Sequence, residues 1–113
     1  MPQVRFLELS PARQALVRVM QAINFGELQG IRVRDANPIF DVDSIVILDM
    51  KLDKEDATRP EFDLADFVLN TEVSHLMSRL DEFKNGKIQR LEVRAGIPRR
   101  LILESRLAEY PQL

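Results

Sequence analysis

The chain has 113 residues and a mass of 13.0 kDa, which fits a single domain with one hydrophobic core. Its 45% hydrophobic and 30% charged residues are typical of a globular protein and exclude collagen, low-complexity and wholly disordered chains. The lack of cysteine excludes disulfides and Cys-ligated zinc, and the single histidine leaves no His-rich metal site. No apolar run is long enough for a membrane span, and the N-terminus has no signal-peptide layout, so we expect a cytoplasmic protein with no membrane partner.

The first helix is predicted to begin after Ser10. The Ser10 hydroxyl can accept an orphan backbone N–H, and Pro11 suits the first helical position because no donor is needed there. An apolar stripe at helical spacing follows and ends where Gly26 lets the chain leave the helix; it consists of Ala12, Leu16, Val19, Met20 and Ile23. Residues 4–9 form either a short strand at a sheet edge or a lead packed on this helix.

A second helix is predicted further along the chain. Asp63 can cap it, with Phe62 and Phe67 as a hydrophobic staple across its first turn, and Asn85-Gly86 provides its C-terminal exit. Its apolar stripe consists of Leu69, Val73, Leu76, Met77 and Leu80.

Each helix is followed by alternating segments that predict half-buried strands. Residues 31–34 and 91–94 form the first strand of each pair, and Val46, Leu48, Met50 and Leu52 share the inward parity of a returning strand, as do Leu101 and Leu103. We expect a tight turn at residues 95–98 and a longer loop opening at residues 35–38.

The sequence contains two copies of one unit. An offset of 60 residues superimposes the identical pairs Gly26/Gly86, Gln29/Gln89, Val33/Val93, Arg34/Arg94 and Pro38/Pro98. An offset of 55 superimposes Ile47 on Ile102 and Leu48 on Leu103, so the first copy carries five extra residues between its strands. Two copies are fewer than a solenoid needs, which favours a duplicated unit that shares one core.

These elements predict an α+β fold made of a tandem αββ repeat. We expect residues 1–113 to form one domain of two units, about 10–52 and 63–107, joined by a polar linker at 53–62. The shared parity of the apolar strand positions predicts a four-stranded antiparallel sheet with two helices on one face. The duplication suggests a pseudo-two-fold axis between the units.

Few residues are candidates for chemistry. His75 lies between Glu72 and Arg79 on the second helix, which favours a surface position over a general-base role. The carboxylates at 41–43 and 53–56 lack the glycine and spacing of a calcium loop and are interpreted as solvated loop charge. We therefore expect no catalytic residues, no metal site and no cofactor.

The outward face of the predicted sheet is the main candidate surface. By parity it carries six basic and three acidic side chains together with Ile47 and Ile102, and no aromatic residue falls on these strand positions. One interpretation is a solvated face neutralised by cross-strand pairs such as Asp49 with Arg34 and Glu104 with Arg94. A second is a protein interface at Ile47 and Ile102. A third is nucleic-acid binding through Arg32, Arg34, Arg90, Arg94, Arg99 and Arg100.

The stretch from the first helix through residues 24–36 resembles the YezD-like family of small bacterial proteins, which have a helix, an aromatic-Gly step and a strand ending in Asp-Gly or similar. Gly96 keeps the turn glycine in the second copy, whereas Ala36 replaces it in the first. That family has no assigned function. The resemblance therefore implies a bacterial source, an αββ unit and relatives that pair as dimers, with this chain as a fused version, but it implies no site residues.

These observations together predict a small non-enzymatic interaction or adaptor protein, most simply a homodimer. The duplication, the missing catalytic set and the outward isoleucines are its basis. A nucleic-acid-binding regulator is the alternative, and an enzyme whose site forms between subunits around His75 is the remote one.

Overall fold

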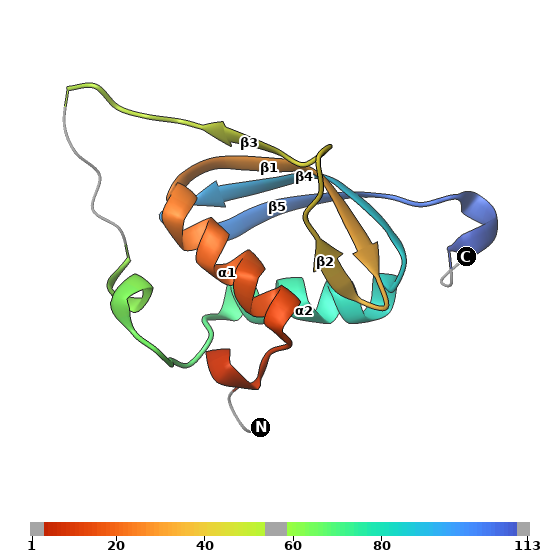
Figure 1. The fold of residues 1–113 in the computed structure, drawn as a ribbon, viewed down its shortest axis with the longest axis horizontal. Helices are drawn as coiled ribbons and strands as arrows, with labels where there is room; N and C mark the ends of the chain where they lie inside the picture. The colour runs from red at the N-terminus through yellow and green to blue at the C-terminus, as the bar shows by residue number, and fades with distance from the viewer. Residues whose placement is uncertain (1–3, 54–58, 111–113) are drawn as a thin grey trace.

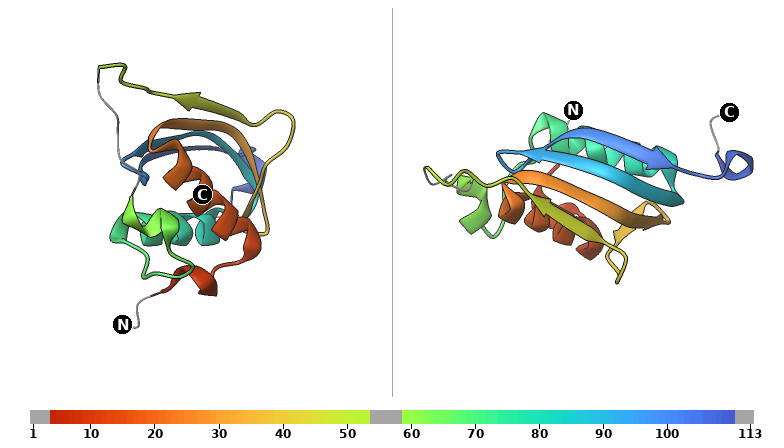
Figure 2. Two further views of the ribbon diagram at one scale, coloured as in Figure 1. Left: turned by 60° about the vertical axis from the view of Figure 1, so that its left-hand side comes forward. Right: turned by 90° about the horizontal axis from the view of Figure 1, so that it is seen from above.

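The computed structural model describes residues 4–53 and 59–110, and it confirms an α+β fold with the order αββ followed by αββ (Figure 1). The helices are α1 (Pro11–Ile23) and α2 (Thr71–Phe83), and the strands are β1 (Phe25–Arg34), β2 (Asn37–Ile39), β3 (Ile45–Leu48), β4 (Gly86–Arg94) and β5 (Ile97–Glu104). Short 3-10 turns lie at Phe6–Glu8, Pro60–Asp63 and Leu107–Glu109. Both helices lie on one face of the sheet (Figure 2).

The sheet is antiparallel throughout, with the order β2-β1-β4-β5, and β3 also pairs with β1. β2 pairs with residues 32–34 of β1, and β3 pairs with residues 26–29, so the two short strands share one edge of the sheet. β5 forms the opposite edge. The predicted four-stranded sheet is therefore confirmed, with one of its edge strands divided in two.

The division of that edge strand corrects the predicted position of the longer loop. Asp35 and Ala36 form a two-residue turn with positive φ angles of 51° and 64°, as Ala95 and Gly96 do in the second unit. The expected tight turn after β4 is confirmed, whereas the loop expected at residues 35–38 is wrong. The five extra residues lie at 40–44, between β2 and β3.

A pseudo-two-fold axis passes between β1 and β4. Leu28 lies opposite Leu91, and their repeat equivalents, Ile88 and Ile31, lie opposite each other. These four side chains are 3% exposed or less and form the centre of the core. The other fully buried core side chains are Leu16, Val17, Met20, Leu80 and Val93.

The two units also exchange equivalent hydrogen bonds. The Ala36 N–H of the first turn donates to the Lys84 carbonyl after α2 (2.8 Å), and the Gly96 N–H of the second turn donates to the Asn24 carbonyl after α1 (2.9 Å). Each turn is thus held by the helix end of the other unit, and these links cross between the copies.

α1 begins as predicted. The Ser10 hydroxyl accepts a hydrogen bond from the Arg13 N–H (3.3 Å), and Pro11 is the first helical residue. The predicted exits need correction, because the chain leaves the helices at Asn24 and Lys84, with φ angles of 63° and 66°. Gly26 belongs to β1, where a Cβ would lie 2.0 Å from the Ile47 carbonyl oxygen, so this glycine lets β3 approach β1.

The start of α2 differs from the prediction. The helix begins at Thr71, and Asn70 caps it by accepting from the Val73 N–H (2.9 Å); Asp63 ends the 3-10 turn Pro60–Asp63. Phe67 packs outside the helix, so it forms no staple with Phe62. The predicted linker 53–62 overlaps this turn and includes residues 54–58, which lie outside the described residues.

Phe67 instead joins the N-terminal segment to the core. Its ring stacks on Phe6 with a centroid distance of 5.0 Å, and the Arg18 guanidinium lies 4.3 Å from the centroid of the Phe6 ring. Arg5 forms a single antiparallel bridge with Val68. Of the two arrangements expected for residues 4–9, the packed lead is therefore observed, and it contacts the segment before α2 as well as α1.

Asp66 fastens this N-terminal lead. Its carboxylate accepts from Arg5 Nε (2.7 Å) and from the Leu7 N–H (3.0 Å). These contacts, the Arg5 hydrogen bond first, lower the pKa of Asp66 below its ordinary value of 3.8. The pKa of Glu61 is also lowered, chiefly by a backbone hydrogen bond and then by Arg59.

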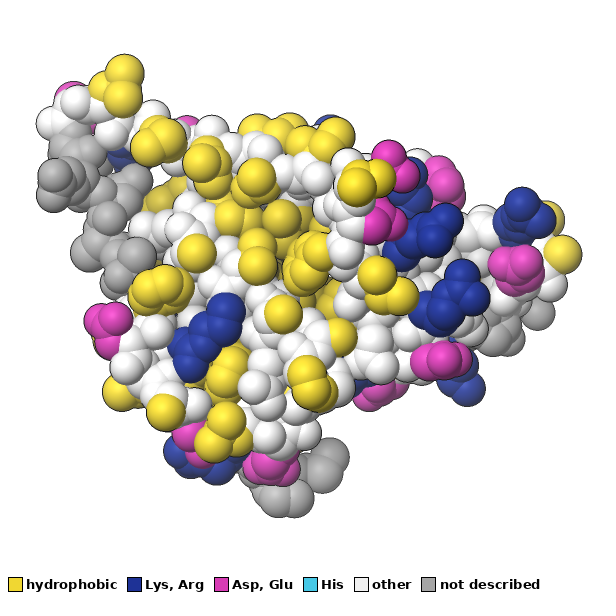
Figure 3. Space-filling view, viewed as in Figure 1, with side chains coloured by type: hydrophobic (Ala, Val, Ile, Leu, Met, Phe, Trp, Pro, Cys, Tyr) yellow, Lys and Arg dark blue, Asp and Glu magenta, His cyan; other side chains and the backbone are white. Residues whose placement is uncertain are grey.

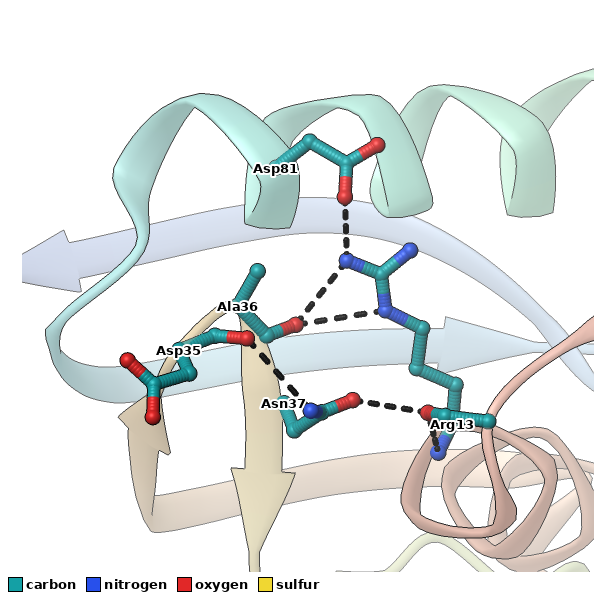
Figure 4. Close-up of polar contacts among 6 residues, drawn as sticks. Arg13, Asp35, Ala36, Asn37 and Asp81 are labelled. Atoms are coloured by element: carbon teal, nitrogen blue, oxygen red, sulfur yellow. Dashed lines mark hydrogen bonds and ion pairs between the residues drawn. The ribbon is translucent and has the colours of Figure 1, made fainter.

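Arg13 links α1, the first turn and α2 (Figure 4). Its Nε and Nη2 atoms donate to the Ala36 carbonyl oxygen (3.2 and 3.0 Å), and Nη2 also pairs with the Asp81 carboxylate. The Arg13 side chain is only 13% exposed, so its hydrogen bonds to the Ala36 carbonyl are partly shielded from water, whereas Asp81 is 65% exposed.

We expect Arg13→Ala to lower the free energy of unfolding by about 1–3 kcal/mol, because the half-buried Ala36 carbonyl loses a charged donor that water cannot fully replace. Urea unfolding followed by circular dichroism measures this change. Arg79→Ala is the matched control, since Arg79 is 67% exposed and forms an exposed ion pair with Glu82 three residues along the same helix. Its loss costs about 0–0.5 kcal/mol, and an equal effect of both variants contradicts the role given to Arg13.

We expect the stabilisation from Asp66 to disappear in acid. Because folding lowers its pKa, the contribution is full above pH 3.8 and is lost as the pH falls through the lower folded value. Asp66→Asn is therefore less stable than the wild type at neutral pH, and the difference closes below pH 3.8. Thermal melts of both proteins from neutral to acid pH test this, and the comparison cancels the parallel titration of Glu61. A difference that does not change with pH contradicts it.

Candidate functional site

The six arginines proposed as a nucleic-acid site lie in three places. Arg32 and Arg34 flank an open cleft at one end of β1, Arg90 and Arg94 lie on the outward face of β4, and Arg99 and Arg100 border a groove between α2 and β5. The pairing registers explain this distribution, because the six positions occupy three strands and both ends of the sheet. They do not form one continuous surface.

The cross-strand charge pairs predicted for the outward face, Asp49 with Arg34 and Glu104 with Arg94, differ from those in the structure. Glu104 lies opposite Lys87, not Arg94, and the Asp49 N–H bonds to the Phe25 carbonyl (2.9 Å), at the far end of β1 from Arg34. The observed cross-strand ion pair joins Arg90 Nε to Glu27 Oε2 at 3.1 Å. Because β1 begins six residues earlier than predicted, the outward face also gains one aromatic ring, Phe25, with the Lys51 ammonium 5.8 Å from its centroid.

The cleft near Arg32 is lined by four basic residues and two acidic ones. It has a volume of about 980 Å³ and lies between the end of the sheet and the last 3-10 turn. Its charged lining consists of Arg32, Arg34, Lys87, Arg106, Glu104 and Glu109. Figure 3 shows basic and acidic side chains gathered together at this end of the molecule.

Ile47 and Ile102 both lie on the outward face, as their parity predicts, but at opposite edges of the sheet. β1 and β4 separate them, and the Glu27–Arg90 ion pair lies on that intervening surface. Ile47 is 42% exposed and Ile102 is half-buried. The two isoleucines therefore do not form a single apolar patch.

The apolar surface that the structure does show runs along β3. All four of its residues, Ile45–Leu48, are exposed, and Figure 3 shows hydrophobic side chains along the upper edge where this strand runs. We predicted that Val46, Leu48, Met50 and Leu52 lie under the helices, and this prediction is wrong. Val46 and Leu48 are 51% and 54% exposed, and Met50 and Leu52 lie beyond the end of the strand.

The inserted residues account for this exposure. Leu103 lies opposite Ile88 in the core, but its repeat equivalent, Leu48, lies opposite Gly26 instead of Leu28. β3 is thus displaced toward the start of β1 relative to its counterpart, by two residues at Leu48 and by three at Val46. The uninterrupted apolar run at 45–48 is the sequence signal for this surface, because a strand covered on one face alternates apolar and polar residues.

The remaining candidate residues have structural roles or exposed positions. His75 is exposed on α2 and borders the groove with Arg99 and Arg100. Asp41 shapes the turn before β3, since its carboxylate accepts from the Asp43 N–H (2.8 Å). Residues 54–56 of the other acidic segment lie outside the described residues. Among the residues that are described, no three His, Asp or Glu side chains are grouped so that they could hold a metal ion.

In the described part of the chain, no helix has the length and apolarity to cross a membrane. Comparison with known proteins finds no matching family model, no matching curated protein and no matching solved structure. The resemblance to the YezD-like family therefore stays a prediction.

Proposed function

We propose that this chain is a non-enzymatic interaction or adaptor protein of the bacterial cytoplasm, and that it self-associates. The observation that supports the proposal most strongly is the exposed apolar edge strand β3. A strand edge with unpaired backbone groups binds other strands readily, and natural proteins usually block it with charges, proline or a covering segment. Within Ile45–Leu48, β3 contains neither a charged residue nor a proline.

Of the two predicted interface residues, Ile47 is favoured. It lies at the centre of the exposed apolar run, whereas Ile102 is half-buried on β5 beside Arg100 and Arg99. His75 lies on α2, which packs over β5 at the other side of the sheet, so it is not part of this surface.

We expect light scattering at micromolar concentration to give twice the chain mass of 13.0 kDa. Ile47→Asp should give the mass of one chain, because a buried carboxylate at a pairing strand is strongly unfavourable. Ile102→Asp is the matched control and should keep the mass of two chains. A wild-type protein that is strictly monomeric contradicts self-association, and loss of the dimer in the Ile102 variant alone places the interface at β5.

Binding of nucleic acid is the second candidate, and the open cleft lined by Arg32, Arg34, Lys87 and Arg106 supports it. Four cations around one concavity outnumber its two carboxylates, a balance that attracts phosphate. The Arg32 side chain is only loosely paired, with its Nε 3.7 Å from Asp41.

We expect fluorescence anisotropy with short single- and double-stranded DNA and RNA to test this second candidate. If the cleft binds phosphates, Arg34→Ala and Arg106→Ala weaken binding and each lowers the salt slope by about one. Arg94→Ala and Arg100→Ala, on the other two surfaces, serve as controls and should change neither quantity. The absence of binding even at low salt removes this candidate and leaves the protein-interaction proposal unaffected.

A further inference from the structure

The free edge of β3 presents a defined set of backbone groups. The Asp49 N–H donates to Phe25, and the Ile47 carbonyl oxygen lies against Gly26, so the odd-numbered residues point their backbone groups toward β1. Because successive residues of a strand point in opposite directions, Val46 and Leu48 present their N–H and C=O groups at the free edge. Figure 2 shows β3 at the border of the sheet, and none of the described strands lies beyond it.

The chemistry of this edge indicates what binds there. Val46 and Leu48 are apolar on one face and Ile45 and Ile47 on the other, so a strand that pairs here should also be apolar on both faces. Within the described residues, β3 is the only strand whose side chains are apolar and exposed throughout. A second copy of β3 therefore has the side chains that this edge requires.

Charges on either side of the apolar run determine how two copies align. In a two-fold antiparallel pair the residue on the axis lies opposite itself. An axis at Ile47 places Asp43 opposite the partner's Lys51, whereas an axis at Val46 places Asp43 opposite the partner's Asp49. Opposite charges stabilise a cross-strand pair and like charges destabilise it, so the arrangement centred on Ile47 is favoured.

The neighbouring positions agree with this alignment. An axis at Ile45 places Asp41 opposite the partner's Asp49, and an axis at Leu48 places Asp43 opposite the partner's Asp53. With the axis at Ile47, Val46 lies opposite the partner's Leu48, and both carry free backbone groups that can exchange two hydrogen bonds.

We propose that two copies of this chain pair β3 with β3 in antiparallel orientation, with Ile47 opposite the partner's Ile47, and form one continuous sheet. Asp43, in the turn before β3, and the partner's Lys51, beyond the end of its β3, are the opposite charges at the two ends of the pairing. This inference rests on the proposed self-association and adds the partner, the strand and the alignment.

Cysteine cross-linking tests the alignment without interference from native cysteines, because the chain contains none. Opposed residues that do not share hydrogen bonds have Cα atoms about 4.5 Å apart, within the reach of a disulfide. Ile47→Cys should therefore form a covalent dimer under mild oxidation, read on a non-reducing gel. Val46→Cys is the matched control, since two copies of this position lie more than about 7 Å apart and cannot be bridged.

A mixture of Val46→Cys and Leu48→Cys should form a covalent heterodimer, because these positions face each other across the pair. Covalent dimers of Val46→Cys alone, with none from Ile47→Cys, overturn the alignment. Circular dichroism of each variant shows whether it is folded, and the exposure of these side chains predicts that it is.

Charge exchange provides a second, independent measurement. Asp43→Lys and Lys51→Asp each replace two attractive pairs by two repulsive ones and should weaken dimerisation on the order of tenfold. The double variant restores opposite charges and should recover most of the affinity, measured by analytical ultracentrifugation. Equal weakening in the single and double variants contradicts the proposed pairing.

The outcomes separate this inference from the function on which it rests. A wild-type dimer whose Ile47→Cys variant does not cross-link keeps the proposed self-association and overturns the β3 alignment. A wild-type protein that stays monomeric at high micromolar concentration overturns both.

Discussion

The antiparallel pairing of β1 with β4 is the interaction on which the rest of the structure depends. Leu28, Ile31 and their equivalents meet across the pseudo-two-fold axis, on the face of the sheet that both helices cover. The same pairing brings each turn to the helix end of the other unit, where Ala36 and Gly96 donate equivalent hydrogen bonds. A single αββ unit lacks the other half of this core and a partner for its turn, so each copy is stabilised by its contacts with the other.

Much of this arrangement is readable from the sequence, because it depends on local chemistry and on repetition. The Ser10 cap, the two apolar helical stripes and the offset between the copies each leave a direct pattern. The start of α2 was misplaced because Phe67 packs on Phe6, far away in the chain, and the Asn70 cap competes with the equally suitable Asp63. The sequence pattern of a hydrophobic staple does not show whether one of its rings packs against a residue far away in the chain instead.

The exposed surface along β3 was harder to predict, because its exposure depends on the pairing register between β3 and β1. Alternation assigns Val46 and Leu48 to the inner face of the sheet, and the structure agrees, since they lie opposite Leu28 and Gly26. Alternation does not show how far along β1 the strand lies, and a displacement of two or three residues decides whether a helix covers it. The arginine partners depend on the same information, which is why Glu104 meets Lys87 and not Arg94.

The five residues between β2 and β3 make the two outer edges of the sheet unequal. A perfect duplication has two like edges, and a molecule with two adhesive edges adds further copies without limit and grows into a filament. Here β5 contains Arg99, Arg100 and Glu104, whereas β3 contains no charged residue within Ile45–Leu48. An assembly that uses one edge per molecule is closed after two copies. In the dimer proposed above, the charged β5 edges stay outside the paired strands and protect the assembly from open-ended polymerisation.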